Sequence, residues 1–177
     1  MPLVEFGHMH FGENKVQEAQ DKWPEIRMQN NNINLHMIGK LQTNKVKFAV
    51  KLFDYIHSVD NKKLAQKIAE EQVKVSKKIK IFIQINIGAE EQKSGVKKNE
   101  ASDLISFCKK INLDVVGLMC LPPADYNSSF YFNEMNLLNN SFSLPELSMG
   151  MSSDYIEATK NSATYLRIGS SIFGERV

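Results

Sequence analysis

Cysteine is scarce in this chain, with only Cys108 and Cys120 among 177 residues. Two cysteines cannot build the disulfide framework of a small secreted domain, and their spacing matches no metal-ligand motif. Both lie in apolar segments, so we expect buried, reduced thiols in a cytoplasmic protein.

Long apolar runs, excess charge and common catalytic motifs are absent as well. No run approaches the roughly 20 apolar residues that a transmembrane helix needs, and the first residues do not show the pattern of a signal peptide. The net charge is only +2, which predicts no strong attraction to nucleic acid or to a membrane. We find no Ser-His-Asp arrangement, no metal-ligand cluster and no G-x-x-x-x-G-K-S/T phosphate loop.

What the sequence does contain is a regular alternation of strands and helices. Seven segments have the apolar character of strands, namely 9–12, 33–38, 55–59, 81–87, 114–121, 147–149 and 164–168. Helical spacing follows each of the first six strands: from Val16, over 43–51, after Asp60, after Gly95, over 130–139 and over 153–161. Pro24 is expected to bend or end the first of these helices, and Asp60 is the expected N-cap of the third. No linker or repeat interrupts the pattern, so residues 1–177 are predicted to form a single α/β domain.

The alternation predicts parallel β-α-β units, whose main closed form is the (β/α)8 TIM-type barrel. Eight strands close such a barrel, and seven are evident. The chain also starts almost directly on a strand, with no helix before it. Either one strand has escaped detection, or the barrel is incomplete.

The ends of the last two predicted strands carry the residues best suited to an anion. Met151 and Ser152 follow one strand, and Gly169 and Ser170 follow the other. In parallel barrels the functional groups lie at the C-terminal strand ends, and the last two loops commonly hold phosphate. Glycine permits close backbone approach, and serine hydroxyls and free amides can donate to phosphate oxygens. Two ordinary polar turns with helix caps are the alternative interpretation.

Three further polar residues in or beside strands are functional candidates. Arg167 lies in an otherwise apolar strand, so its charge needs either an acidic partner or a ligand. Asn14 follows the first predicted strand and fits either a site residue or a helix cap. His36 precedes an apolar run, where a hydrogen-bonded core histidine is more common than a catalyst.

Several motifs, taken in their order along the chain, point to one family. They are Phe-Gly-Glu-Asn-x-Val-Gln-Glu at 11–18, His-x-Ile-Gly-x-Leu-Gln-x-Asn-Lys at 36–45, Ser-Met-Gly-Met-Ser-x-Asp at 148–154 and Arg-Ile-Gly-Ser-x-Ile-Phe-Gly at 167–174. Together they resemble the pyridoxal phosphate homeostasis protein family, whose barrel is similar to the N-terminal domain of alanine racemase. The resemblance covers nearly the whole chain from about Phe6.

The resemblance implies a monomeric, non-catalytic protein that binds pyridoxal 5'-phosphate (PLP), buffers it and passes it to PLP-dependent apo-enzymes. It implies phosphate contacts from Ser152, Gly169 and Ser170 with Met151 beside them, Asn14 in the pocket wall, and Arg167 facing the pyridine nitrogen. An arginine cannot accept a proton, so that nitrogen would stay unprotonated. An unprotonated ring is a poor electron sink, which suits a carrier better than an enzyme.

One departure from the family is large. The family bonds its cofactor as a Schiff base to a lysine on the first strand, in a segment resembling Ala-Val-Ser-Lys. This chain has no such segment on a first strand. The partial match Val75-Ser76-Lys77 lies at the end of a predicted helix. We therefore expect an incomplete, N-terminally truncated (β/α)8 TIM-type barrel that lacks the first strand and the N-terminal helices and binds PLP without a covalent bond. Lys40 and Lys45, near the open end, are the alternative points of attachment. A fragment of a racemase-class PLP enzyme and a non-functional truncated gene product are the alternatives.

A barrel without its first strand is expected to be weakly stable, or to need a partner. Two strand edges lose their hydrogen-bond partners. Each large apolar side chain left uncovered forfeits about 1.5–3 kcal/mol, out of a total stability of about 5–15 kcal/mol. Equilibrium unfolding in denaturant measures this directly, and a stable monomer with a cooperative two-state transition would contradict the expectation.

Overall fold

A computed structural model describes residues 2–90, 92–123 and 127–174 of the chain. The elements are, in chain order, α1 (Pro2–Glu5), β1 (His10–Glu13), α2 (Val16–Gln29), β2 (Asn34–Met37), η1 (Thr43–Lys45), α3 (Val46–Leu52), β3 (Tyr55–Val59), α4 (Lys62–Lys74), β4 (Lys80–Ile85), η2 (Lys98–Glu100), α5 (Ala101–Lys110), β5 (Asp114–Cys120), α6 (Ser128–Ser141), β6 (Glu146–Met151), α7 (Tyr155–Lys160), β7 (Tyr165–Arg167) and α8 (Ser170–Phe173).

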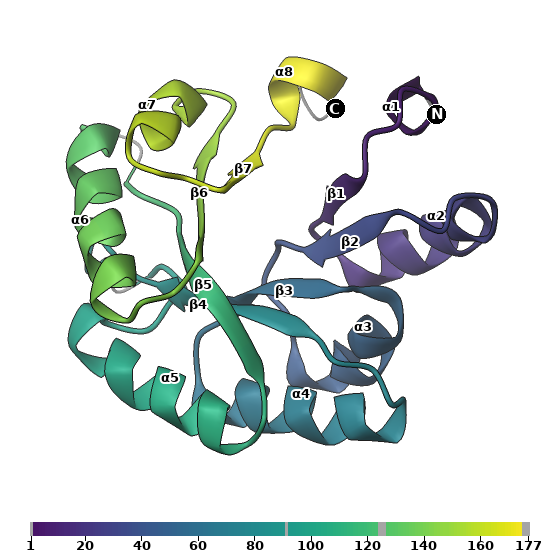
Figure 1. The fold of residues 1–177 in the computed structure, drawn as a ribbon, viewed down its shortest axis with the longest axis horizontal. Helices are drawn as coiled ribbons and strands as arrows, with labels where there is room; N and C mark the ends of the chain where they lie inside the picture. Colours follow the sequence, from purple (N-terminus) through teal and green to yellow (C-terminus); the bar gives the residue numbers. More distant parts are fainter. Residues whose placement is uncertain (1, 91, 124–126, 175–177) are drawn as a thin grey trace.

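The seven strands form one parallel sheet in the order β1-β2-β3-β4-β5-β6-β7, and this confirms the predicted strands. The sheet curves into a barrel wall, with the helices on its outer side (Figure 1). No ladder joins β1 to β7 among the described residues. The architecture is therefore a TIM-type barrel that these seven strands leave open on one side.

The main core lies between the outer face of the sheet and the helices. The helices are amphipathic and turn one apolar stripe inward, as Leu64, Ala65 and Ile68 of α4 do. The facing strand residues, such as Ile81 and Ile83 of β4, are fully buried. Because helices cover this face completely, the strands tolerate the near-continuous apolar runs that the sequence shows.

Three local expectations need correction. A short helix, α1, precedes the first strand. The N-cap of α4 is Asn61, not Asp60, because Asn61 Oδ1 accepts the amide of Leu64 at 2.8 Å. Pro24 does not end α2, which continues to Gln29. Packing of α2 against the sheet, through the buried Trp23 among others, offsets the hydrogen bond that proline removes.

Close contact between neighbouring strands depends on glycine at two positions. A Cβ at Gly117 of β5 would overlap the backbone carbonyl of Glu146 in β6. A Cβ at Gly39, just after β2, would overlap the carbonyl of Asn14, just after β1. In both places the obstacle is backbone, so a side chain could be accommodated only by moving a strand or loop.

We expect Gly117→Ala to lower the free energy of unfolding by about 1–3 kcal/mol, as overpacking does elsewhere. Gly169→Ala is the matched control, because a Cβ there has nothing within 4 Å. Urea unfolding of both variants measures the difference. Equal stability of the two variants would show that β5 and β6 can separate without cost.

Candidate functional site

The loops after β6 and β7 meet at the C-terminal end of the barrel. Ser152 Oγ lies 3.2 Å from the amide nitrogen of Gly169 and 3.4 Å from that of Ser171, both of which donate to it. Two backbone donors from one loop thus converge on an oxygen of the other. An oxygen of a bound anion would find the same donors at this point.

A local turn fixes the first of these loops. The amide of Met151 donates to Asp154 Oδ1 at 2.6 Å, which closes the segment on itself. Gly150 just before it has a φ of +90°, and a Cβ there would lie 2.5 Å from the Cβ of Ala158. Glycine is therefore required for β6 to turn against α7, and Met151 and Ser152 are left partly or fully exposed at the rim.

Arg167 ends β7 in register with Met151 of β6 and turns its guanidinium into the barrel wall. Its Nη1 donates to Ser148 Oγ at 2.7 Å, and its Nη2 donates to the carbonyl of Cys120 at 2.7 Å. No carboxylate of the described residues forms an ion pair with it, so the acidic partner considered as an alternative is not found there. Burial lowers the pKa of Arg167, and the Cys120 thiol and Asp154 oppose that shift.

Three histidines continue this arrangement across the inner face of the sheet. His57 Nδ1 lies 2.8 Å from Ser148 Oγ, His57 Nε2 lies 2.9 Å from His36 Nδ1, and His36 Nε2 lies 2.9 Å from His10 Nδ1. One hydrogen-bonded chain therefore runs from Arg167 through β6, β3 and β2 to β1. We call these five residues the relay.

Aromatic rings pack on the two central histidines of the relay, His36 and His57, which are both buried. Tyr55 stacks on His36 with ring centroids 4.2 Å apart, and Phe82 stacks on His57 at the same distance. Burial lowers the pKa of His36 to about 3 and places the pKa of His57 well below its ordinary value. Both imidazoles are therefore neutral at physiological pH.

The structure brings five of the six predicted site residues to one place, namely Met151, Ser152, Arg167, Gly169 and Ser170. Asn14 is exposed at the C-terminal end of β1, the other border of the open sheet. Its side chain forms no hydrogen bond with the other five, all of which are described. His36 is the hydrogen-bonded core residue that its surroundings predicted.

Sequence reasoning missed His10, His57 and Ser148. A signal was present, because each of three neighbouring strands in an otherwise apolar sheet carries one histidine. Their contact depends on the register between strands, which the sequence does not show. Across residues 2–90, 92–123 and 127–174 no three or more His, Cys, Asp or Glu side chains are grouped to hold a metal ion. In the same residues no helix is both long enough and apolar enough to cross a membrane.

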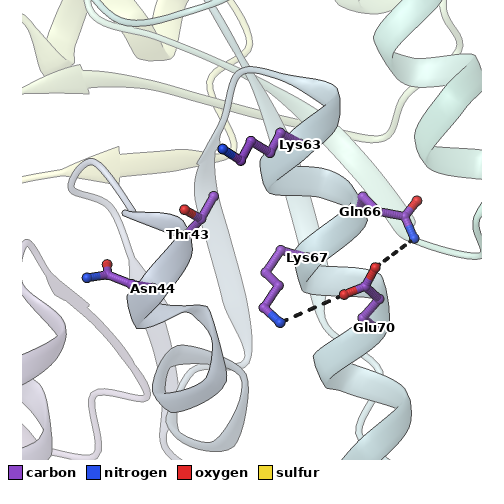
Figure 2. Close-up of a pocket in the computed structure, with 6 residues that line it drawn as sticks. All are labelled: Thr43, Asn44, Lys63, Gln66, Lys67 and Glu70. Atoms are coloured by element: carbon purple, nitrogen blue, oxygen red, sulfur yellow. Dashed lines mark hydrogen bonds and ion pairs between the residues drawn. The ribbon is translucent and has the colours of Figure 1, made fainter.

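A separate hollow lies outside the barrel, between η1 and α4 (Figure 2). It is lined by Thr43, Asn44, Lys63, Gln66, Lys67 and Glu70. Lys67 is paired with Glu70 and Glu71, so this cation is already compensated. The hollow shares no residue with the relay or with the loops after β6 and β7, which we call the rim loops.

Comparison with known proteins now gives the family. A family model of the alanine racemase N-terminal domain matches residues 1–177. A pyridoxal phosphate homeostasis protein of Aquifex aeolicus is 37% identical over 176 residues, which cover 94% of this chain and 76% of the relative. The chain belongs to the pyridoxal phosphate homeostasis protein family. Another member, from Synechocystis, is 38% identical and is matched over 83% of its length by 97% of this chain.

Solved structures agree with this family assignment. PipY of Synechococcus elongatus, solved without PLP, superposes with a TM-score of 0.90 at 30% identity, covering 98% of this chain and 85% of PipY. The same protein with PLP bound gives a TM-score of 0.88. An alanine racemase of Clostridium difficile gives 0.75 at 17% identity over 47% of its length, which shows the fold alone. The family members compared here are named as homeostasis proteins and not as enzymes.

The neutral, buried histidines make stability depend on pH. The ordinary pKa of 6.5 applies to His36 in the unfolded chain, against about 3 in the folded chain. Below pH 6.5 the unfolded chain therefore binds a proton that the folded chain does not. The free energy of unfolding should fall as the pH decreases from about 7 to 5, by up to about 1.4 kcal/mol per pH unit for each such histidine.

Urea unfolding at several pH values in this range measures the slope. His36→Gln should reduce it, because one of the titrating imidazoles is removed. His8→Gln is the control, since His8 is exposed and lies outside the relay. An unchanged slope in His36→Gln would contradict the assignment of a neutral His36.

Proposed function

We propose that this protein binds PLP non-covalently, takes part in PLP homeostasis and catalyses no reaction of its own. The observation that carries the proposal is the convergence of two backbone amides on Ser152 Oγ, in the loops that follow β6 and β7, next to the strand end where Arg167 lies. The family's name and the PLP-bound PipY structure support the choice of ligand.

The rim loops fit a phosphate group. The amides of Gly169 and Ser171 both donate to Ser152 Oγ. An anion oxygen at that point would receive the same two amides, and the Ser152 hydroxyl, moved aside, could donate to it as well. The position of a Cβ at Gly169 has nothing within 4 Å, so space remains beside these donors. Ser170 begins α8 in the same turn, and Met151 lies beside Ser152 at the strand end.

Arg167 fits the ring end of the ligand. A guanidinium has five N–H donors, and the two contacts inside the barrel leave three of them for other acceptors. When bound, PLP supplies an aldehyde and an electron-withdrawing pyridine ring. Arg167 can donate to the ring nitrogen but has no proton acceptor, so it holds that nitrogen in the unprotonated, weakly electron-withdrawing form. This is the basis for proposing a carrier and not an enzyme.

The remaining parts of the proposal concern the surroundings. Asn14 would line the pocket from the far border of the sheet, opposite the rim loops. The free, buried thiols of Cys108 and Cys120 suit a reducing compartment, which supports a cytoplasmic location. PLP held without a covalent bond can be released, and this suits transfer to PLP-dependent apo-enzymes.

We expect Ser152→Ala to weaken PLP binding about tenfold, because a hydrogen bond to a charged group is worth roughly 1.5–3 kcal/mol and this one, at the partly exposed rim, should lie at the lower end. Ser153→Ala is the matched control, one residue away and exposed. Titration followed by fluorescence, with PLP and with pyridoxal that lacks the phosphate, separates the two ends of the ligand. Pyridoxal should bind both variants equally.

Equal PLP affinity in Ser152→Ala and Ser153→Ala would refute the phosphate assignment. Borohydride reduction of the PLP-loaded protein, followed by intact mass measurement, tests the non-covalent mode. No mass increase is expected, and an increase by one reduced PLP would show that a lysine bonds it and would contradict the non-covalent mode.

A further inference from the structure

The relay goes beyond what PLP binding requires. Only Arg167, at one end of it, is a proposed ligand contact. The other end, His10, lies in the first strand and is exposed. Four contacts of 2.7–2.9 Å join the two ends without a gap, through Ser148, His57 and His36.

Hydrogen-bonding rules favour one direction for this chain when its histidines are neutral. Arg167 can only donate, so it gives a proton to Ser148 Oγ. Among the described residues, the sole acceptor in hydrogen-bonding contact with the Ser148 hydroxyl is His57 Nδ1. A buried hydroxyl without an acceptor costs free energy, so Ser148 donates to His57.

The direction then passes along the histidines. His57 accepts at Nδ1 and, being neutral, carries its proton on Nε2, from which it donates to His36 Nδ1. His36 is likewise neutral and donates from Nε2 to His10 Nδ1. His10 Nδ1 must therefore be free of a proton for the relay to hold.

Protonation of His10 is incompatible with this order. A proton on His10 Nδ1 would face the proton on His36 Nε2, so this contact must break or the donors from Ser148 to His36 must reverse, with Arg167 still donating. In the reversed order both His57 and Arg167 donate to Ser148, whose own hydroxyl proton loses its acceptor. A break of the His10–His36 contact alone leaves Ser148 unchanged, whereas the reversal reaches Ser148, the partner that holds the Arg167 guanidinium.

We propose that Ser148, His57 and His36 are positioning residues for Arg167, and that His10 is a remote proton-binding site that controls Arg167 through them. The part of this proposal that concerns the ligand rests on the proposed function, in which Arg167 faces the PLP ring. The relay itself is a property of the protein alone.

The groups around His10 determine where it titrates. Burial contributes most to lowering the pKa of His10, the positive charges of His8 and Lys80 lower it further, and Glu146 opposes them. The other groups that face it are the rings of His36, Tyr55 and Tyr165. The response of Arg167 should therefore appear on the acidic side of the ordinary histidine range, below about pH 6.5.

The first experiment uses the ligand-free protein labelled with nitrogen-15. Nuclear magnetic resonance should show His57 and His36 as Nε2-protonated tautomers at neutral pH. The Arg167 Nε–H signal should shift with the same midpoint as His10 titration. In Ser148→Ala, His10 should still titrate while the Arg167 signal no longer follows it. Nδ1-protonated His57, or an Arg167 signal that still follows His10 in Ser148→Ala, would overturn the relay.

The second experiment measures PLP affinity from about pH 8 to about pH 5. His10→Gln can accept from His36 but cannot bind a proton, so it keeps the relay direction at every pH. His8→Gln is the matched control, since it removes an exposed histidine outside the relay. Because the charge of His8 lowers the pKa of His10, the loss of affinity in this variant should begin at a slightly higher pH. The ligand's own titrations affect all three proteins equally and cancel in their ratio.

We expect equal affinity of wild type and His10→Gln at the alkaline end. At the acidic end wild type and His8→Gln should bind about five- to tenfold more weakly than His10→Gln, the equivalent of one hydrogen bond. Parallel profiles for wild type and His10→Gln would overturn control by His10. If wild type binds no PLP at any pH, the proposed function fails, and the resonance experiment still decides the relay.

Discussion

The hydrogen bond between Arg167 and Ser148 is the constraint on which the inner face of the barrel depends. It places in the barrel wall a cation that forms no ion pair with a carboxylate of the described residues, so the contacts seen there come from neutral oxygens. Those oxygens then need partners of their own, which is why the polar chain extends through His57 and His36. A cation that is held but not neutralised remains available to an electron-rich or anionic ligand.

The parallel fold explains how the candidate site is assembled. All seven strands point the same way, so the loops that follow them lie at one end of the barrel. The loops after β6 and β7 come together there although Ser152 and Gly169 are far apart in sequence. Close strand contact at Gly117 brings β5 beside β6, and the Cys120 carbonyl at the end of β5 thereby reaches Arg167.

Much of the fold was predictable, because a helix or a buried strand follows from the spacing of apolar residues within one segment. The loops after β6 and β7 were predictable for a related reason, since glycine and serine at the end of a parallel strand indicate close backbone approach and hydrogen-bond donors within one short segment. The relay was not predictable, because it depends on which residues of different strands face each other. His36 lies opposite Tyr55, and a shift of one residue would turn it to the outer face. The spacing of apolar residues also could not decide which of two neighbours, Asp60 or Asn61, would be the N-cap of α4.

The relay and its aromatic neighbours also bear on the open side of the barrel. Tyr165 of β7 packs on His10 of β1 with ring centroids 5.8 Å apart, and on His36 of β2 at 5.3 Å. The two border strands are therefore joined through the barrel interior, although no ladder connects them among the described residues. Ring contacts of this kind stabilise by about 0.5–1.5 kcal/mol beyond the area they bury. These interior contacts thus compensate part of the stability that the unpaired edges lose, and the two histidines that make them belong to the relay that ends at Arg167. The relay and its aromatic neighbours therefore both stabilise the open barrel and position the Arg167 guanidinium.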